Sequence, residues 1–393
     1  MPMNIVFVST GIYPDQHAAA IRHSTIAQGF IENGHQLHFF LLSSQPWEKN
    51  EINYKGVIIK SLNNYHGSNK IKKIYYFLKA LNDLRKRILH INNSFKIDGI
   101  VVFSIDVAAL KALISLAKEN RIKIFHERTE LPYIIGKGNS LMSNYVYKYY
   151  ITILIPKFDG IFVISDKLKD YFISYNKNIE KILTVVDTAF FRPVNPSLYT
   201  FRYIAYCGNL GNDKDGIPIL IESFAKLTNN FPQLKLLLIG QNSNSLEIKK
   251  VLNTIKKFNI ENKVVFTGFV DRNDMPTLLG HADLLVISKP DNEQNSGNFP
   301  IKIGEYLATG KPIVATKVGE IPKFIIDGES GFLAIPNSSE SFYHKMEEAL
   351  TDYTKSVQIG SNGKKIAEQV FDYKVQANKM AAYINKINLP YGN

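Results

Sequence analysis

A glycine-rich loop that carries one lysine offers the first chemical signal in the sequence. Residues 208–227 read GNLGNDKDGIPILIESFAKL, so Gly208, Gly211 and Gly216 surround Lys214, and a helical pattern begins directly after them. Glycines let backbone N–H groups approach a phosphate, a helix N-terminus adds positive potential, and lysine supplies a cation. The segment predicts a phosphate-binding loop; an ordinary glycine-rich turn with a solvated lysine is the alternative.

A second segment places a carboxylate on a helix. Residues 296–316 read SGNFPIKIGEYLATGKPIVAT, and Glu305 lies within a helix expected over about residues 300–308. A carboxylate can accept hydrogen bonds from two ribose hydroxyls at once, and the amides before the helix are expected to face a diphosphate. Pro300 suits the first helical turn. The alternative is a surface helix that exposes Glu305 and Lys302.

A third loop follows an expected strand that ends at Gly268. Residues 266–288 read FTGFVDRNDMPTLLGHADLLVIS, and Phe269 and Val270 begin the loop. We expect its backbone groups to pair with the edge of a nucleobase. A plain strand-to-helix turn would look the same.

One Asp-x-Asp string occurs, at residues 213–215. In some transferase folds such a pair holds a divalent metal on a diphosphate. Here Lys214 stands between the two acids, and its ammonium group supplies the charge that a metal would bring. We therefore expect no metal ion and no other cofactor.

Short apolar runs alternate with amphipathic helical patterns along the whole chain. Near-continuous apolar strands between helices imply parallel sheets covered on both faces, and two such series imply two doubly wound domains. In such folds ligands bind beyond the carboxyl ends of the strands, where these loops begin. The expected strands cover residues 5–9, 37–42, 99–103, 122–126 and 160–164, then 203–208, 234–240, 263–268, 283–288 and 312–316.

The composition narrows the class of protein. The 393 residues are 45% hydrophobic and 21% charged, as in an ordinary globular protein. The single cysteine, Cys207, excludes a disulfide framework and a multi-cysteine zinc site, and it favours a cytoplasmic setting. The formal charge of +12 indicates an anionic partner. We find no secretory signal in the first residues and expect no transmembrane helix.

The order and spacing of these segments resemble glycosyltransferase family 4 over nearly the whole chain. In the C-terminal half the shared strings are KDG (214–216), GFV (268–270), LLGHAD (278–283) and EYLATGKPIVA (305–315). In the N-terminal half they are AAAIRHSTIAQGFIENGHQLHFF (18–40), SDKLKDYF (165–172) and VVDTAFFRP (185–193).

The resemblance implies an α/β fold of the GT-B type, with two facing Rossmann-like domains and an interdomain cleft. It implies an acceptor-binding domain at residues 1–193, a nucleotide-sugar-binding domain at 194–371, and a C-terminal helix at 372–393 that crosses back to the first domain. The implied activity is retaining transfer of a sugar from a nucleotide diphosphate donor, with a UDP-sugar favoured. The implied acceptor is a glycan or a lipid-linked glycan in cell-surface polysaccharide biosynthesis.

The resemblance also assigns roles to residues. Lys214 would stabilise the charge on the leaving diphosphate and Glu305 would bind the ribose. The full donor set is Gly208, Asn209, Gly211, Lys214, Gly268, Phe269, Val270, Gly297, Asn298, Phe299, Pro300, Ile301, Lys302 and Glu305.

Two positions depart from the family pattern. Asn209 stands where an arginine is common, and Gly297 stands where the first of two glutamates is common, eight positions before Glu305. We interpret the chain as a subfamily variant in which Lys302, Asn298 and nearby amides take over phosphate and sugar contacts.

The acceptor side is expected in the N-terminal half. Residues 122–133 read IKIFHERTELPY, a strand followed by a loop. His126 and Glu127 lie where some family members carry a catalytic-region histidine or acid, and a structural role for a lone histidine is the alternative. The remaining acceptor-side candidates are Arg128 and Glu130 in this segment and His17 and Arg22 near the first strand.

Residues 68–89 predict a basic amphipathic helix with a single acid, Asp83. Such a helix can lie on an anionic membrane, so we expect peripheral contact with the inner face of the membrane; packing of the apolar stripe on the chain's own sheet is the alternative. The stripe consists of Ile71, Ile74, Leu78, Leu81, Leu84 and Ile88.

Two other functions remain open from the sequence alone. A nucleotide-sugar epimerase would use the same architecture, and a non-catalytic nucleotide-sugar-binding partner would agree with the two departures. A nucleic-acid partner is not expected, because no recognition module is visible.

Overall fold

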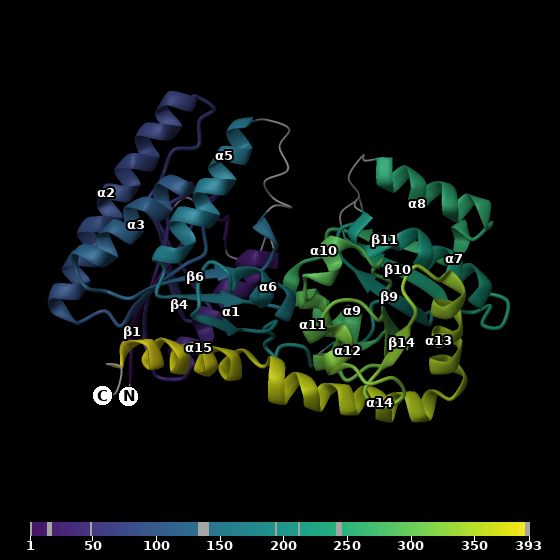
Figure 1. Ribbon diagram of the computed structural model, residues 1–393. Helices are drawn as coiled ribbons and strands as arrows, with labels where there is room; N and C mark the ends of the chain where they lie inside the picture. Colours follow the sequence, from purple (N-terminus) through teal and green to yellow (C-terminus); the bar gives the residue numbers. More distant parts are fainter. Residues whose placement is uncertain are drawn as a thin grey trace. The chain divides into compact units, whose positions relative to one another are not determined.

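The computed structural model describes residues 2–13, 18–47, 49–132, 141–192, 195–210, 213–240 and 246–389. It divides into two compact units. The first consists of Met1–Val185 together with Tyr373–Asn393, and the second is Val186–Asp372 (Figure 1). The chain thus passes between the units twice. The two passages are joined, because the Val186 amide donates to the Phe371 carbonyl (2.9 Å) and the Thr188 hydroxyl donates to Asp372 (2.8 Å).

The first unit is built on an eight-stranded sheet in the order β3-β4-β2-β1-β5-β6-β7-β8. All neighbours are parallel except β3 and β4, whose hairpin turns at Lys55 and Gly56, both with positive φ as such a turn requires. The strands are β1 (Asn4–Ser9), β2 (Gln36–Leu41), β3 (Glu51–Tyr54), β4 (Val57–Ser61), β5 (Gly99–Val102), β6 (Ile124–Arg128), β7 (Gly160–Val163) and β8 (Ile179–Lys181).

Helices cover this sheet, and the last helix of the chain packs against the first (Figure 1). Gly29 permits that contact, because a Cβ there would lie 2.6 Å from the Tyr373 carbonyl oxygen. The helices are α1 (Ala18–Glu32), α2 (Lys70–Ser94), α3 (Val107–Glu119), α5 (Leu141–Tyr149), η1 (Tyr150–Leu154), η2 (Ile155–Lys157), α6 (Asp166–Phe172) and α15 (Tyr373–Asn388).

The second unit is built on a six-stranded parallel sheet in the order β11-β10-β9-β12-β13-β14. The chain runs outward from β9 in one direction, then returns to β12 and runs outward in the other. The topological switch point, where ligands bind in such sheets, therefore lies at the carboxyl ends of β9 and β12. The strands are β9 (Tyr203–Cys207), β10 (Lys235–Ile239), β11 (Val264–Gly268), β12 (Leu284–Ile287), β13 (Ile313–Thr316) and β14 (Phe332–Ala334).

The helix that carries Glu305 begins after Pro300, its N-cap, and ends at Gly310, which has φ 75°. This helix is α11 (Ile301–Thr309). The other helices of the second unit are η3 (Asp213–Asp215), α7 (Ile217–Leu227), α8 (Leu246–Lys257), η4 (Glu261–Lys263), η5 (Arg272–Asp274), α9 (Met275–Gly280), α10 (Glu293–Ser296), α12 (Ile321–Phe324), α13 (Ser339–Thr351), α14 (Tyr353–Ile366) and η6 (Ala367–Phe371).

None of the helices in the described part of the chain combines the length and apolar character needed to cross a membrane.

Candidate functional site

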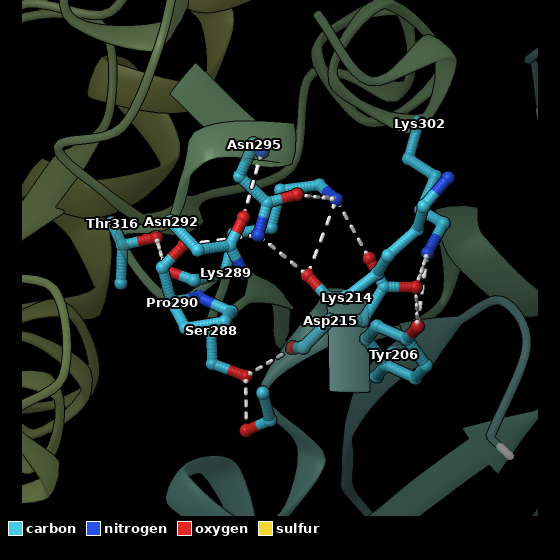
Figure 2. Close-up of polar contacts among 11 residues, drawn as sticks. Tyr206, Lys214, Asp215, Ser288, Lys289, Pro290, Asn292, Asn295, Lys302 and Thr316 are labelled. Atoms are coloured by element: carbon cyan, nitrogen blue, oxygen red, sulfur yellow. Dashed lines mark hydrogen bonds and ion pairs between the residues drawn. The ribbon is translucent and has the colours of Figure 1, made fainter. Parts of the chain in front are cut away.

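A buried carboxylate between two lysines lies at the switch point of the second unit (Figure 2). Asp215, at the end of the loop that follows β9, pairs through Oδ1 with Lys289 Nζ at 2.9 Å. Its Oδ2 pairs with Lys302 Nζ at 2.7 Å and accepts a hydrogen bond from the Tyr206 hydroxyl at 2.6 Å. The carboxylate thus ties together the loops after β9 and β12 and the first turn of α11.

The charges in this cluster support one another. Burial alone would raise the pKa of Asp215, but the ammonium groups of Lys302 and Lys289 outweigh burial and hold that pKa well below its ordinary value. Burial lowers the pKa of Lys289, and the Asp215 charge opposes this effect. Burial, with Asp215 alongside, raises the pKa of Tyr206 far above its ordinary value, so the phenol keeps its proton.

Asn295 and Ser288 fix the same loops through the backbone (Figure 2). The Asn295 side chain donates to the carbonyl oxygens of Lys214 and Pro290, each at 2.9 Å, and accepts from Lys289 Nζ at 3.1 Å. The Ser288 hydroxyl lies 3.0 Å from the carbonyl oxygens of both Asp215 and Gly216. The residues that follow β12 therefore fix the backbone of the segment that carries Lys214.

Gly208 has no side chain and so leaves room for the ammonium group of Lys302. A Cβ on Gly208 would clash with Lys302 Nζ and with the Tyr206 hydroxyl oxygen, so Lys302 lies directly against the backbone at the carboxyl end of β9. Gly216, with φ 63°, passes close to the Ser288 carbonyl, and a Cβ there would clash with it. Glycine is required at both positions by a close approach.

Glu305 lies one turn along α11 from Lys302 and is paired with Arg272. Arg272 Nη1 is 2.6 Å from Glu305 Oε1, and the Glu305 residue is only 6% exposed. Burial and the Glu305 charge raise the pKa of the nearby Cys207 thiol to about 12, while the Lys302 and Arg272 charges act in the opposite direction. The charges of Glu305, Lys302 and Arg272 therefore all act on Cys207, the last residue of β9.

Residues 187–366 match the family described as Glycosyl transferases group 1, nearly the whole of the second unit. An uncharacterized glycosyltransferase of Methanocaldococcus jannaschii is 23% identical over 344 residues, which are 87% of this chain and 88% of that protein. This chain is a glycosyltransferase whose second unit matches the group 1 family. The capsular polysaccharide biosynthesis glycosyltransferase CapM of Staphylococcus aureus is 24% identical over 277 residues, 61% of this chain and 66% of CapM.

Solved structures show that this glycosyltransferase has the GT-B fold. A sucrose-phosphate synthase from Thermosynechococcus elongatus superposes with a TM-score of 0.73, at 16% identity, over 98% of this chain and 99% of that one. Anabaena HepE, solved in complex with UDP and glucose, also gives 0.73, at 19% identity and with the same coverage. The predicted fold class and the predicted enzyme class are both confirmed.

The remaining donor-set residues of the glycosyltransferase border the same cluster. Gly297, Phe299 and Pro300 are buried, while Asn298 and Ile301 are half-buried. The buried Phe299 ring packs against those of Phe324 and Phe371, so only its backbone can face a ligand.

The outer donor-set residues are more exposed. Asn209 is exposed, Val270 is half-buried and Phe269 is 73% exposed directly after Gly268, which has φ 70°. Gly211 lies outside the described residues.

In the first unit of the glycosyltransferase, Glu127 and Arg22 form a buried pair. Arg22 Nε is 2.7 Å from Glu127 Oε1, and its other nitrogens donate to the carbonyl oxygens of Ile182 and Leu183 at 2.9 and 2.5 Å. Burial would raise the pKa of Glu127, but Arg22 and His23 bring it to about 2. Arg22 and Glu127, expected at the acceptor and catalytic sites, are thus occupied in joining α1, β6 and the segment after β8.

His126, expected to be catalytic, lies fully buried in the same unit. Its Nδ1 is 2.9 Å from the Val102 carbonyl oxygen, Nε2 is 2.8 Å from the Tyr150 hydroxyl, and its ring stacks on Phe158. Burial lowers its pKa to about 3, so it is neutral. We reinterpret His126 as a core residue, because both nitrogens and one ring face are occupied by protein partners.

The other acceptor-side residues lie after β6. Arg128 is largely buried and donates from Nη2 to the Glu130 carbonyl at 3.3 Å, while Glu130 is half-buried. His17 lies outside the described residues.

Sequence reasoning missed four contributors to the donor-side cluster, Tyr206, Lys289, Asn295 and Arg272. Lys289 and Tyr206 lie at ends of apolar strands, which is a weak signal. Arg272 lies in the third loop, and no spacing within that loop pairs it with Glu305.

Proposed function

We propose that this glycosyltransferase moves a sugar from a UDP-sugar onto a glycan or lipid-linked acceptor, with retention of anomeric configuration, in the assembly of a cell-surface polysaccharide. The observation that carries the proposal is the fixed Lys302 ammonium at the switch point, one helical turn from the Glu305 carboxylate. The Anabaena neighbour solved with UDP and glucose supports the choice of UDP, and the name of CapM supports a polysaccharide product.

The site supplies charge where the leaving group develops it. Departure of UDP builds negative charge on the distal phosphate, and a donor already in position stabilises that charge without reorganisation. Asp215 and Tyr206 hold Lys302 in such a position, and Asn295 holds the backbone of Lys214. Lys302 and Lys214 therefore bind the diphosphate, the Gly208 and Gly297–Phe299 backbone lines it, and Glu305 accepts the two ribose hydroxyls.

No metal is required in this scheme. The Asp215 carboxylate, the buried acid of the Asp-x-Asp string, is occupied by two ammonium groups and a phenol. Within the described residues, no group of three or more metal-ligating side chains lies close enough to hold an ion. Full activity after EDTA treatment is expected, and loss of activity that Mg²⁺ restores would contradict metal independence.

The direct test measures donor and product. A thermal-shift panel of nucleotide sugars should identify the donor, because a ligand that binds the folded state raises the melting temperature. Lys302→Met and Lys214→Met should each reduce that shift, whereas the exposed Lys355→Met of α14 should not. NMR of the product made with that donor should show the donor's anomeric configuration. An inverted product, or full shifts in both lysine variants, would contradict the proposal.

For the acceptor side we propose Arg128 and Glu130, at the carboxyl end of β6. Among the described residues, Arg128 Nε is one of the few buried polar atoms with no hydrogen-bond partner. A buried donor without a partner is costly, and an acceptor oxygen would satisfy it. Arg128→Lys should raise KM for the acceptor and leave the donor KM unchanged.

We also propose that α2 contacts an anionic membrane at the cytoplasmic face. Only the second half of its apolar stripe is buried, at Leu84 and Ile88, whereas Ile71 is 79% and Leu78 is 55% exposed beside several lysines. The alternative, that the apolar stripe packs within the protein, therefore holds only for the second half of the helix. Sedimentation with vesicles containing anionic lipid should be stronger than with neutral vesicles. Leu78→Ser should weaken it, and equal binding to both vesicles would contradict the proposal.

A further inference from the structure

We propose that Arg272 is a positioning residue of the donor site, which holds the Glu305 carboxylate oriented for the two ribose hydroxyls. The inference rests on the proposed function, in which Glu305 binds the ribose. It concerns a residue in a different loop, η5 after β11, whose Nη1 lies 2.6 Å from Glu305 Oε1.

The Glu305 carboxylate needs such a partner because it is buried. An ionised carboxylate in a buried position is costly unless a cation compensates it. The contact to Oε1 also fixes the plane of the carboxylate, so that its acceptor positions are set before the donor arrives.

Arg272 is itself held in place. Its guanidinium carbon lies 5.5 Å from the centre of the Phe190 ring and 5.1 Å from that of Phe191, and Phe191 is fully buried. The turn that carries it is capped by Asp271, whose Oδ1 accepts from the Asn273 amide at 2.9 Å. A planar guanidinium against aromatic rings loses less freedom on pairing than a flexible ammonium would, so lysine is not equivalent here.

The arginine also sets the charge of the site. Lys214, Lys289, Lys302 and Arg272 carry four positive charges, and Asp215 and Glu305 carry two negative charges, which leaves +2 for a diphosphate. Without Arg272 the same side chains would leave +1, with the Glu305 charge no longer compensated. The arginine that is absent at position 209 is thus replaced in charge by one from the third loop.

The test is ribose discrimination, the ratio of the dissociation constant for 2′,3′-dideoxy-UDP to that for UDP, measured by calorimetry. Two hydrogen bonds to a charged carboxylate predict a wild-type ratio of roughly 100-fold or more. Glu305→Gln should lower it to a few-fold. Arg272→Met should lower it to a similar value and Arg272→Lys to an intermediate one, while Lys355→Met should keep the wild-type ratio.

The outcomes separate this inference from the proposed function. If Arg272→Met keeps the wild-type ratio while Glu305→Gln loses it, the positioning role of Arg272 is refuted and the ribose site stands. If Glu305→Gln also keeps the wild-type ratio, the ribose assignment fails and the positioning role fails with it. The readout is the ratio of two dissociation constants measured on the same variant. Disturbed folding that weakens both ligands equally would leave this ratio unchanged and would not produce the expected result. The conservative Arg272→Lys variant provides a second measurement of the same ratio.

Discussion

Replacing Asp215 by asparagine removes the one negative charge between Lys289 and Lys302. Each ion pair, at 2.7 to 2.9 Å, has a gross attraction of about 6 kcal/mol at an effective dielectric constant near 20, most of which desolvation offsets. An asparagine has one acceptor oxygen and one NH₂ group, so one ammonium group would face another donor. Lys289, which is 5% exposed, would be left buried without compensation, at a cost of about 3–5 kcal/mol. The uncompensated charge of Lys302 adds less to this cost, because its side chain is partly exposed to water.

Hydrogen exchange detects this loss locally. Because the protein has two units, a single global unfolding transition is not assumed, and the amides of β9 are compared with those of β1 in the first unit. A loss of about 3–5 kcal/mol predicts exchange in β9 that is faster by a factor of roughly 100 to 1,000 or more, with β1 unchanged.

Two further variants sharpen the result. Asp83→Asn removes an exposed pair with Arg87 in α2 and should leave β9 unchanged. Adding Lys289→Met to Asp215→Asn removes the uncompensated cation and should restore part of the protection. Asp215→Asn with less than about 1 kcal/mol of lost protection would refute the view that this buried carboxylate holds the two lysines.

Three further predictions concern single residues. Burial holds the pKa of His126 at about 3, below the ordinary 6.5, so its neutral form stabilises the fold above pH 6.5 and that stability is lost as the pH falls toward 3. The unfolding free energy can be measured at several pH values by urea titrations followed by the fluorescence of Trp47, the only tryptophan. Below pH 6.5 this free energy should fall less steeply with falling pH in His126→Gln than in the wild type, by about 1.4 kcal/mol per pH unit. The same pH dependence in both proteins would contradict a neutral His126. Gly208→Ala should displace the flexible end of Lys302, press on the Tyr206 hydroxyl and weaken UDP binding about tenfold. Gly240→Ala, whose Cβ would clash with the Gly208 backbone carbonyl, should lower the melting temperature more than Gly208→Ala does; equal effects of the two changes on stability would count against this distinction.

The main strands of the second unit could be predicted because they are buried on both faces and therefore apolar throughout. The expected strands at residues 203–208 and 283–288 correspond to β9 and β12 within a residue or two. Short edge strands were missed, among them β3, β8 and β14, because three or four residues give too little pattern. For α2 the periodicity predicted the helix and its apolar stripe. It does not reveal that Ile71 and Leu78 stay exposed, because that depends on how far the sheet extends.

The site was predictable where a loop follows a strand and only in part elsewhere. Lys214 and Glu305 could be proposed from the sequence because each lies in a segment with its own spacing, and their donor roles stay predictions. The pairing of Asp215 with Lys302 joins residues 87 positions apart, and that of Arg272 with Glu305 joins the turn η5 to the helix α11. His126 and Glu127 looked functional because polar residues end a strand, but their partners come from α1 and from the helical segment at Tyr150. Only the folded chain shows that these partners occupy them.

The most direct test of the account is a crystal structure of the chain with bound UDP. The account predicts phosphate oxygens within hydrogen-bond distance of Lys302 Nζ, beside Gly208, and both ribose hydroxyls on the Glu305 carboxylate, with Arg272 still paired to Oε1. A complex with UDP bound away from the carboxyl ends of β9 and β12, or with the ribose on another residue, would contradict it.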